Sequence, residues 1–375
     1  MRIIVSHEVA ADDGLRASWN SLLDQTENAQ VFYTYEWAIA VQRAYGSIFK
    51  PLVFLFYETD KLVGIAPLAT SLSSRHAFFL TATTADYCDI LCDPEYTHRI
   101  WASLQAELRK LGVETLVLAN MPEDSPTHKA LQESKTYGFH SHIRKAYDCA
   151  RVVLGSAEHR AEIKLVLSKK KVYRRAIRQM MSQGLEVLHL REYSEVSPCL
   201  EQFYSAHIAR FRATGRKSNL EDSDRRLFLT ELARELCATQ SMVLSCLRLH
   251  DAPVAWNYGF RFRGCWFWYQ PTFDSAYEDF SPGFSLLGKI IEASCDDPEL
   301  AVVDLGLGAE EYKERFATSI RRTVYATLQQ SRVGHVQTAM RYCLSTWVKH
   351  SPYTERKVRQ LMNKRHRETI SAPSA

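Results

Sequence analysis

Apolar residues recur along the chain with two different spacings, which predict a mixture of helices and strands. Residues 32–45 place apolar side chains every three or four positions, as on one face of a helix. Residues 52–69 form two apolar runs around the polar turn Thr59-Asp60-Lys61, as in a β-hairpin. An initial helix is also expected around residue 19, and a further helix is expected at 98–111. The other strands expected in the first half lie at 77–83, 114–119, 138–143 and 151–154.

The second half repeats this plan. Its expected helices lie at 165–181, 197–213 and 223–238, and its expected strands lie at 185–190, 242–249, 253–262 and 265–273. The turns of the two hairpins carry Asp60 and Asp251, 191 positions apart, which is about the length of one domain. The repeat predicts an α/β fold with mixed (α+β) sheets, in two units over 1–155 and 156–335, followed by a basic helical tail over 336–375.

The composition is that of an ordinary globular protein, with 46% hydrophobic and 24% charged residues. The net charge of +4 is mild and does not by itself indicate a nucleic-acid partner. The nine cysteines are scattered and form no CxxC pair, which favours reduced, mostly buried thiols over disulfides or a zinc site. The N-terminal segment has no long apolar core, and no apolar run approaches a membrane span, so we expect a cytoplasmic protein without a signal peptide.

The segment 281–313 carries the strongest chemical signal, because its pattern predicts a loop, a helix, a strand, a loop and a helix. Ser281 is a good N-cap, and Pro282 suits the first helical position. Gly283 has no side chain, so a ligand can approach the backbone there. The start of this helix therefore predicts an anion site, built from free amides and the positive end of the helix dipole. Asp304 ends the following strand, where α/β sheets place their ligands.

An ordered set of motifs resembles one family. The first half has a Phe-x-Thr-x-x-Trp pattern at Phe32, Thr34 and Trp37, and the second half has HIARFRATGRKSN from His207, then APVAW, YEDFSPGFSLL and VVDLGLGAEEYK. This order resembles the CelD/BcsL-type acyltransferases, whose second half is a BioF2-like domain of the GNAT superfamily. The resemblance covers most of residues 15–328 and implies two tandem GNAT-like units, of the kind also seen in the Fem aminoacyl transferases. It also implies acyl transfer, often associated with cell-surface polysaccharide synthesis.

The resemblance implies that the segment SPGFS holds the pyrophosphate of acetyl-CoA or another acyl-CoA. The residues assigned to this co-substrate are Ser281, Gly283, Phe284, Ser285 and Lys313. The commoner GNAT loop, Arg/Gln-x-x-Gly-x-Gly/Ala, is absent, and SPGFS stands in its place. A well-capped helix without a ligand is the alternative interpretation, because such caps are common.

Acyl transfer needs a base for the acceptor and an acid for the leaving thiolate. His207 and Asp304 are the candidate bases, since histidine titrates near neutral pH and Asp304 ends a strand. Tyr312 is the candidate acid. The alternatives are that His207 only shapes a pocket, and that Asp304 and Tyr312 belong to a strand end and a solvated helix.

Three further residues are candidates for substrate binding: Arg210 in the HIARFRATG segment, and Trp256 and Trp268 in the aromatic strands. Aromatic faces can stack on a sugar or hold an acyl chain, whereas core packing is the commoner reason for aromatic residues in strands. By resemblance, a backbone amide of the strand 265–273 holds the oxyanion, and a bulge is expected near Gln270-Pro271.

Two segments are strongly basic. Residues 163–185 contain seven lysines and arginines and no acid, and residues 341–367 contain eight with Glu355 as their one acid. Solvated helices are the default interpretation. The alternative is an anionic partner, namely a lipid-linked sugar phosphate, an anionic membrane surface or tRNA.

Together these patterns predict an acyl-CoA-dependent acyltransferase that moves an acyl group, acetyl by preference, to an amine or hydroxyl of a sugar-type acceptor in exopolysaccharide biosynthesis. Direct attack in a ternary complex is favoured, since no cysteine stands in an activated setting. The alternatives are a Fem-like aminoacyl transferase that uses charged tRNA and a non-catalytic GNAT-like scaffold in polysaccharide export. P-loop, HExxH, GxSxG and zinc spacings are absent, so hydrolase and kinase functions have little support and no metal is expected.

Overall fold

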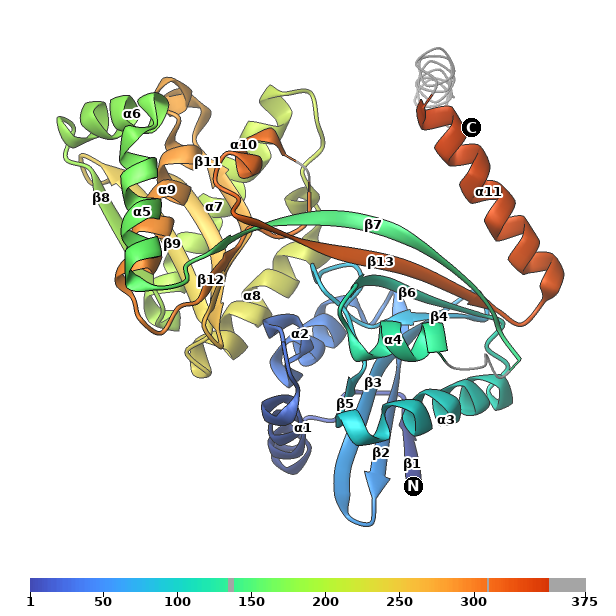
Figure 1. Cartoon of the computed structure of the whole chain (residues 1–375). Helices are drawn as coiled ribbons and strands as arrows, with labels where there is room; N and C mark the ends of the chain where they lie inside the picture. The colour runs from blue at the N-terminus through green and yellow to red at the C-terminus, as the bar shows by residue number, and fades with distance from the viewer. Residues whose placement is uncertain (134–137, 309, 351–375) are drawn as a thin grey trace, which may run out of the picture.

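The chain folds into two α/β halves that share one continuous mixed β-sheet (Figure 1). The structure, a computed structural model, describes residues 1–133, 138–308 and 310–350, with residues 344–350 described by their backbone. Thirteen strands of the described chain form the sheet, in the order β1-β2-β3-β4-β6-β13-β7-β12-β11-β10-β9-β8, with β5 beside β3. The predicted mixed α/β fold is confirmed.

The first half carries six strands and four α-helices of the described chain. They are β1 (Arg2–Ser6), β2 (Phe49–Glu58), β3 (Lys61–Ser71), β4 (His76–Phe79), β5 (Leu91–Cys92), β6 (Thr115–Pro122), α1 (Asp13–Gln25), α2 (Tyr35–Tyr45), α3 (Thr97–Lys110) and α4 (Pro126–Glu133). The predicted hairpin is the antiparallel β2–β3 pair. Its turn holds Thr59 at a positive φ of 55°.

The second half carries the helices that surround the candidate site. Its elements are α5 (Ala157–Lys169), α6 (Lys171–Met181), β8 (Glu186–Leu190), α7 (Tyr193–Ala213), α8 (Ser223–Ala238), β9 (Met242–Leu249), β10 (Ala252–Phe262), β11 (Cys265–Phe273), α9 (Pro282–Asp296), β12 (Val302–Asp304) and α10 (Glu311–Glu314). The single helix predicted over 165–181 is wrong, because Lys170 adopts an extended conformation (φ −65°, ψ 113°) between α5 and α6. This break lets Leu167 of α5 and Tyr173 of α6 both pack inward.

Two long strands join the halves (Figure 1). β7 (His140–Val153) pairs with β13 (Ser319–Gln329), β13 also pairs with β6, and the end of β7 pairs with β12. The strands predicted at 138–143 and 151–154 are therefore one strand, since neither Gly nor Pro interrupts the ladder between His140 and Val153. β13 follows residue 156 in the chain yet lies between β6 and β7, so the two units share their sheet.

The Phe-x-Thr-x-x-Trp motif lies where the two halves meet. The Thr34 hydroxyl accepts a hydrogen bond from the Trp37 amide and so caps α2. The Phe32 and Trp37 rings contact each other with centroids 4.7 Å apart. Trp37 also packs edge-on against Phe260 of β10, at 5.2 Å between centroids. The motif therefore anchors the first half on the second.

Aromatic residues of β10 and β11 divide between two cores. Trp256, Tyr258 and Phe260 belong to the core that extends into the first half, whereas Trp266 and Trp268 belong to the second core, on the α9 side of the sheet. The alternation of faces predicted for these strands is confirmed. Packing, the commoner role of strand aromatics, accounts for all five.

Candidate active site

Three adjoining cavities form a cleft that runs from the start of α9 to the first half of the chain. The α9 cavity, of about 230 Å³, is lined by Arg210, Pro271, Thr272, Phe273, Glu278, Ser281, Gly283, Phe284 and Tyr312. The central cavity, of about 680 Å³, shares with it Arg210, Pro271 and Tyr312. The aromatic cavity, of about 690 Å³, shares with the central cavity Thr83, Lys217, Asn219 and Arg225. The shared residues show that the three cavities are neighbours.

The α9 cavity opens onto the first turn of α9. Pro282 occupies the start of the helix, as predicted. Gly283 and Phe284 follow in the first turn, where amide groups have no acceptor inside the helix. A Cβ on Gly283 would lie 3.1 Å from the Phe273 ring, so a side chain at this position would narrow the cavity. The segment has the geometry that the predicted anion site requires.

Ser281 lines the α9 cavity, but its side chain does not cap the helix. Its backbone is left-handed (φ 48°, ψ 51°), and its hydroxyl accepts no hydrogen bond from the helix. The Ser281 carbonyl instead accepts a hydrogen bond from the Ser285 amide at 3.0 Å. The prediction of a hydroxyl cap is wrong, because the left-handed conformation departs from the extended backbone of the usual N-cap.

Arg210 of α7 is the cation shared by the α9 and central cavities. Its guanidinium lies over the Phe273 ring, 4.3 Å from the centroid. Burial lowers the pKa of this guanidinium, and no carboxylate of the described residues forms an ion pair with it. Glu278 lines the same cavity without forming an ion pair with Arg210. A partly buried cation without a directly paired carboxylate, beside a helix N-terminus, favours an anionic ligand.

Tyr312 lies at the junction of the same two cavities. Its hydroxyl oxygen accepts a hydrogen bond of 3.1 Å from the indole nitrogen of Trp268. The hydroxyl proton therefore remains available to a ligand in the cleft. Burial raises the pKa of Tyr312 to about 12, so the group keeps its proton at neutral pH. This position and protonation state fit the predicted acid.

Asp86 brings a titratable carboxyl from the first half into the central cavity. Burial and the neighbouring Asp304 charge raise the pKa of Asp86 to about 7, against the opposing effects of Lys313 and of a hydrogen bond with the Leu307 backbone. A carboxyl that titrates near neutral pH suits general-base catalysis. The sequence analysis did not assign this residue to the site.

The loop after β12 encloses Asp86. Gly306 has a φ of +70°, and a Cβ there would collide with the Asp86 carboxylate. Lys313 Nζ donates to the Leu307 carbonyl at 2.7 Å and pairs with Glu310 at 2.8 Å. Lys313 is thus buried beneath this loop and is not among the residues that line the α9 cavity. Its position does not support the predicted contact with a phosphate.

Asp304 joins the two halves and is not among the residues that line the three cavities. Its carboxylate accepts hydrogen bonds from the Tyr87 hydroxyl, at 3.0 Å to each oxygen, and from the Gly306 amide at 2.9 Å. Arg151 Nε lies 3.7 Å away, and Asp304 is 1% exposed. An acceptor has no approach to this carboxylate, so the location does not support the predicted base role. Asp304 acts on the site through Asp86, whose pKa it raises.

His207 lies in the wall of the central cavity, where α7 buries it. Its Nδ1 is 2.8 Å from the Ser218 hydroxyl, and its Nε2 is 3.3 Å from the Gln270 amide nitrogen. Burial and the nearby Arg210 lower the pKa of His207 to about 4. A neutral ring with both nitrogens engaged is a weak base at neutral pH. The structure therefore favours the alternative in which His207 shapes the pocket.

Three other predicted site residues lie outside the cavity walls. Trp256 and Trp268 are buried in the two cores, and Trp268 reaches the cleft only through its hydrogen bond to Tyr312. Ser285 is fully buried, and its hydroxyl has no hydrogen-bond partner among the described residues. Of the residues assigned to the donor, those that line the α9 cavity are Ser281, Gly283 and Phe284.

A bulge interrupts the pairing of β10 with β11 at the central cavity. Tyr258 pairs with Gln270 and Phe260 with Phe267, so β11 has one extra residue between these pairs. This position adjoins the bulge predicted near Gln270-Pro271, and both of these residues line the central cavity. A bulge takes strand residues out of the ladder, which leaves backbone groups for a ligand.

Arg225 of α8 lines both the central and the aromatic cavities. It is 9% exposed, and its guanidinium donates to the Tyr269 hydroxyl at 2.8 Å and to the Gln270 side-chain oxygen at 3.1 Å. Its Nε has no hydrogen-bond partner within the described part of the chain. A buried cation that is held by neutral groups favours an anionic ligand. The sequence gives little sign of this role, because arginines are common on helix surfaces.

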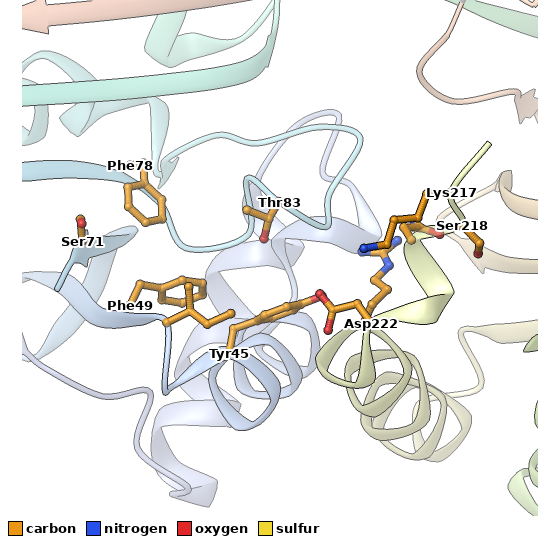
Figure 2. A pocket seen from close by; sticks show the side chains of 11 residues that line it. Tyr45, Phe49, Ser71, Phe78, Thr83, Lys217, Ser218 and Asp222 are labelled. Atoms are coloured by element: carbon orange, nitrogen blue, oxygen red, sulfur yellow. The ribbon is translucent and has the colours of Figure 1, made fainter. Parts of the chain in front are cut away.

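The aromatic cavity has rings at one end and charged side chains at the other (Figure 2). Tyr45 and Phe49 stack with centroids 6.1 Å apart, and Phe49 meets Phe78 edge-on at 5.7 Å. Lys217 and Asp222 lie at the opposite end. This arrangement fits a ligand that combines a ring or apolar body with an anionic group.

Replacement of Asp86 by asparagine should stabilise the fold at alkaline pH. The raised pKa means that ionisation of Asp86 costs more in the folded protein than in the unfolded chain, so stability falls as pH rises from about 4 to about 7. We expect Asp86→Asn to raise the free energy of unfolding by about 1–3 kcal/mol at pH 8 and to leave it nearly unchanged at pH 4. Urea unfolding at the two pH values measures this, and a destabilised variant at pH 8 would contradict it.

Comparison with known proteins finds a family model that matches part of the second half. Residues 168–314 match the family model of the acetyltransferase (GNAT) domain. The second half is therefore similar to a GNAT acetyltransferase domain. The matched segment includes α6, α7, α9 and the loop that encloses Asp86, and so most of the cleft's second-half wall. A search of curated proteins finds no match.

Solved structures resemble the whole chain in fold. The chain is similar to FemX at 8% identity, over 87% of this chain and 97% of that one, with a TM-score of 0.62. It is similar to the C-terminal domain of an Agrobacterium fabrum protein named as a lysylphosphatidylglycerol synthetase, at 13% identity over 86% and 93% of the two chains, with a TM-score of 0.54. It is also similar to L-PGS from Bacillus licheniformis, at 9% identity over 80% and 94%, with a TM-score of 0.50. Likeness at this level of identity shows a shared fold.

Proposed function

We propose that this protein transfers an acyl group, acetyl by preference, from a coenzyme A thioester to a hydroxyl or amine of a sugar-type acceptor. The observation that carries the proposal is the continuity of the cleft. The α9 cavity, with its helix N-terminus, leads through Tyr312 and Asp86 in the central cavity to the aromatic cavity of the first half. In this proposal the donor occupies the α9 cavity, the acid and base lie in the central cavity, and the acceptor occupies the aromatic cavity.

The α9 cavity fits the phosphates of the donor. The amides of Gly283 and Phe284 point from the first turn of a helix, and the helix dipole favours negative charge there. Arg210 adds a cation that forms no ion pair with a carboxylate of the described chain, although Glu278 lines the same cavity. Coenzyme A supplies an activated acyl group as a thioester, and these residues would hold its phosphates at the open end of the cleft.

The groups in the central cavity fit the proton transfers of acyl transfer. Asp86, ionised above about pH 7, accepts the proton from the attacking hydroxyl or amine as the new bond to the acyl carbon forms. The carbon–sulfur bond breaks, and Tyr312 donates its proton to the departing sulfur. Backbone groups of the β11 bulge adjoin this point and suit the oxyanion. Proton exchange with solvent then restores Asp86 and Tyr312.

Direct transfer is favoured over a covalent enzyme intermediate. Burial raises the pKa of Cys88, Cys92 and Cys149 to about 12, so these thiols stay protonated. Only the thiolate is an effective nucleophile. None of the nine cysteines is among the residues that line the central cavity.

The aromatic cavity supports an acceptor that carries both a ring and a negative charge. Tyr45, Phe49 and Phe78 present apolar ring surfaces, on which the carbon face of a sugar can pack. Lys217 lies at the other end together with Asp222, and Arg225 also lines this cavity. The two cations suit a phosphate. A sugar nucleotide or a lipid-linked sugar phosphate has this combination of groups.

The proposal is tested by release of free coenzyme A thiol from acetyl-CoA. We expect the purified protein to release thiol faster when a sugar nucleotide or a polyprenyl-phosphate sugar is added, and the acylated acceptor to be detected by mass spectrometry. Binding of acetyl-CoA with no thiol release across sugar nucleotides and polyprenyl-phosphate sugars would count against a sugar-type acceptor. Absence of binding would count against the donor.

A second candidate, transfer of an aminoacyl group from tRNA, is favoured by the surface of α6. Its outward positions carry Lys171, Arg174, Arg175 and Arg178, none of which forms an ion pair within the described residues. The helix lies next to the α9 cavity, because it contacts α9 and the segment Ser275–Phe280. Binding of charged tRNA with a steep salt dependence, lost in Arg174→Glu/Arg175→Glu, together with no binding of acetyl-CoA, would favour this candidate.

A further inference from the structure

Helix α11 (Arg332–His350) packs against the body of the protein by its polar face. Figure 1 shows it beside the far ends of β7 and β13, projecting from the molecule. The Thr338 hydroxyl accepts a hydrogen bond from the Gln329 side-chain amide at 2.7 Å. His335 and Tyr342 contact the ring of His142 on β7, at centroid distances of 6.4 and 5.4 Å. Residues 335, 338 and 342 therefore form the face that meets the protein.

The opposite face of α11 is apolar and exposed. Val333, Val336 and Met340 are 66%, 53% and 59% exposed. They follow one another at intervals of three and four residues, which places them on one face of the helix. An amphipathic helix in a globular protein normally turns its apolar face to the core. In α11 the polar face contacts the protein and the apolar face is exposed, so we expect a partner molecule or surface to cover the apolar face.

Positive charge accompanies the apolar face. Arg332 and Arg341 are exposed on α11. The sequence beyond the described residues, 351–375, contains six lysines and arginines and two glutamates. The part of the predicted basic tail after residue 350 lies outside the described residues. An apolar helical face combined with a cluster of cations is the combination by which peripheral proteins adsorb to anionic lipid surfaces.

We propose that α11 docks this protein on an anionic membrane surface, with Val333, Val336 and Met340 inserted at the level of the lipid headgroups. The proposal does not depend on the transfer reaction. Within residues 1–133, 138–308 and 310–350, no helix is both long and apolar enough to cross a bilayer. Because α11 exposes one apolar face, we expect it to lie at the interface, parallel to the membrane plane.

A second copy of the chain is a less well supported partner for the same face. The spacing of Val333, Val336 and Met340 also fits the seam of a coiled coil. However, α11 is 19 residues long, and coiled coils are recognised by apolar heptads sustained over about three to four repeats. The flanking positions are occupied by Gln337 and Ala339, which supply no opposite charges to pair two helices. Charge complementarity with lipid is the stronger argument.

Vesicle binding can be read from the helix itself. Cys343 is the exposed member of the nine cysteines, so an environment-sensitive fluorophore can be attached there in the full chain. We expect its emission to shift to the blue with vesicles of about 30% phosphatidylglycerol in phosphatidylcholine, and to stay unchanged with phosphatidylcholine alone. The shift should diminish as sodium chloride is raised, because the cations are screened.

A pair of matched variants locates the contact. Val336→Glu/Met340→Glu is expected to lower the partition coefficient for anionic vesicles at least about tenfold, because two inserted apolar side chains are lost. Leu165→Glu/Leu227→Glu adds the same charge at side chains that are 52% and 45% exposed on α5 and α8. It should lower the coefficient by less than about threefold. Circular dichroism checks that both variants fold.

Three outcomes would overturn the proposal. The first is the absence of a spectral shift with anionic vesicles. The second is an equal loss of vesicle binding in the control variant, which would show that added negative charge weakens binding wherever it is placed on the protein. The third is a dimer in light scattering that Val336→Glu/Met340→Glu converts to a monomer, which would assign the face to a second copy of the chain.

Discussion

Asp86→Asn is expected to lower kcat/KM for acyl transfer by about 10²- to 10⁴-fold, the usual contribution of a general base. The asparagine keeps the size of the side chain beside Gly306 but cannot accept the acceptor's proton. In the wild-type protein kcat/KM should rise with pH up to about 7, because Asp86 must be ionised to act as a base. Steady-state kinetics from pH 5 to 9 measure both effects.

Asp89 provides the matched control for this prediction. It lies in the same loop, and burial raises its pKa also to about 7. It is not among the residues that line the central cavity, and its carboxylate accepts a hydrogen bond from the Ile90 amide. Asp89→Asn should keep kcat/KM within a few-fold of wild type. Equal losses in both variants, or a pH dependence that survives Asp86→Asn, would remove Asp86 from the base role.

Arg210→Gln is expected to weaken the affinity for acetyl-CoA by about 10- to 100-fold, because it removes a charged partner of the phosphates at the α9 cavity. Arg212, two positions later on α7, is the control: it is exposed and pairs with Glu221 at 2.9 Å, outside the cavity walls. Arg212→Gln should leave the dissociation constant nearly unchanged. Titration calorimetry measures the affinity of both variants for acetyl-CoA. Equal affinities in Arg210→Gln and Arg212→Gln would place the phosphates away from Arg210.

Local patterns along the chain were sufficient to predict the start of α9. Pro282 and Gly283 mark a helix start by their own backbone properties, and the structure places them at the first turn of α9. The alternation in β10 and β11 likewise assigned Trp256 and Trp268 to opposite faces. Such features depend on residues a few positions apart in the sequence, so they can be predicted without knowledge of the tertiary structure.

The position of Asp86, the proposed base, could not be predicted in this way. Asp86 acquires its raised pKa from packing against the loop of Gly306 and Leu307, which is far along the chain. Asp304 seemed the better candidate because it ends a strand, but the Tyr87 hydroxyl from the other half occupies its carboxylate. The position of β13 between β6 and β7 was not predictable for the same reason. These properties arise from contacts between the halves, which sequence periodicity does not encode.

Calorimetric titration of the wild-type protein and of Gly283→Glu with acetyl-CoA tests the central claim most directly, since a carboxylate at the start of α9 opposes a phosphate there. The account predicts saturable binding at one site in the wild type, its loss in Gly283→Glu, and its retention in Asp86→Asn. No heat with the wild-type protein, or unchanged affinity in Gly283→Glu, would contradict it.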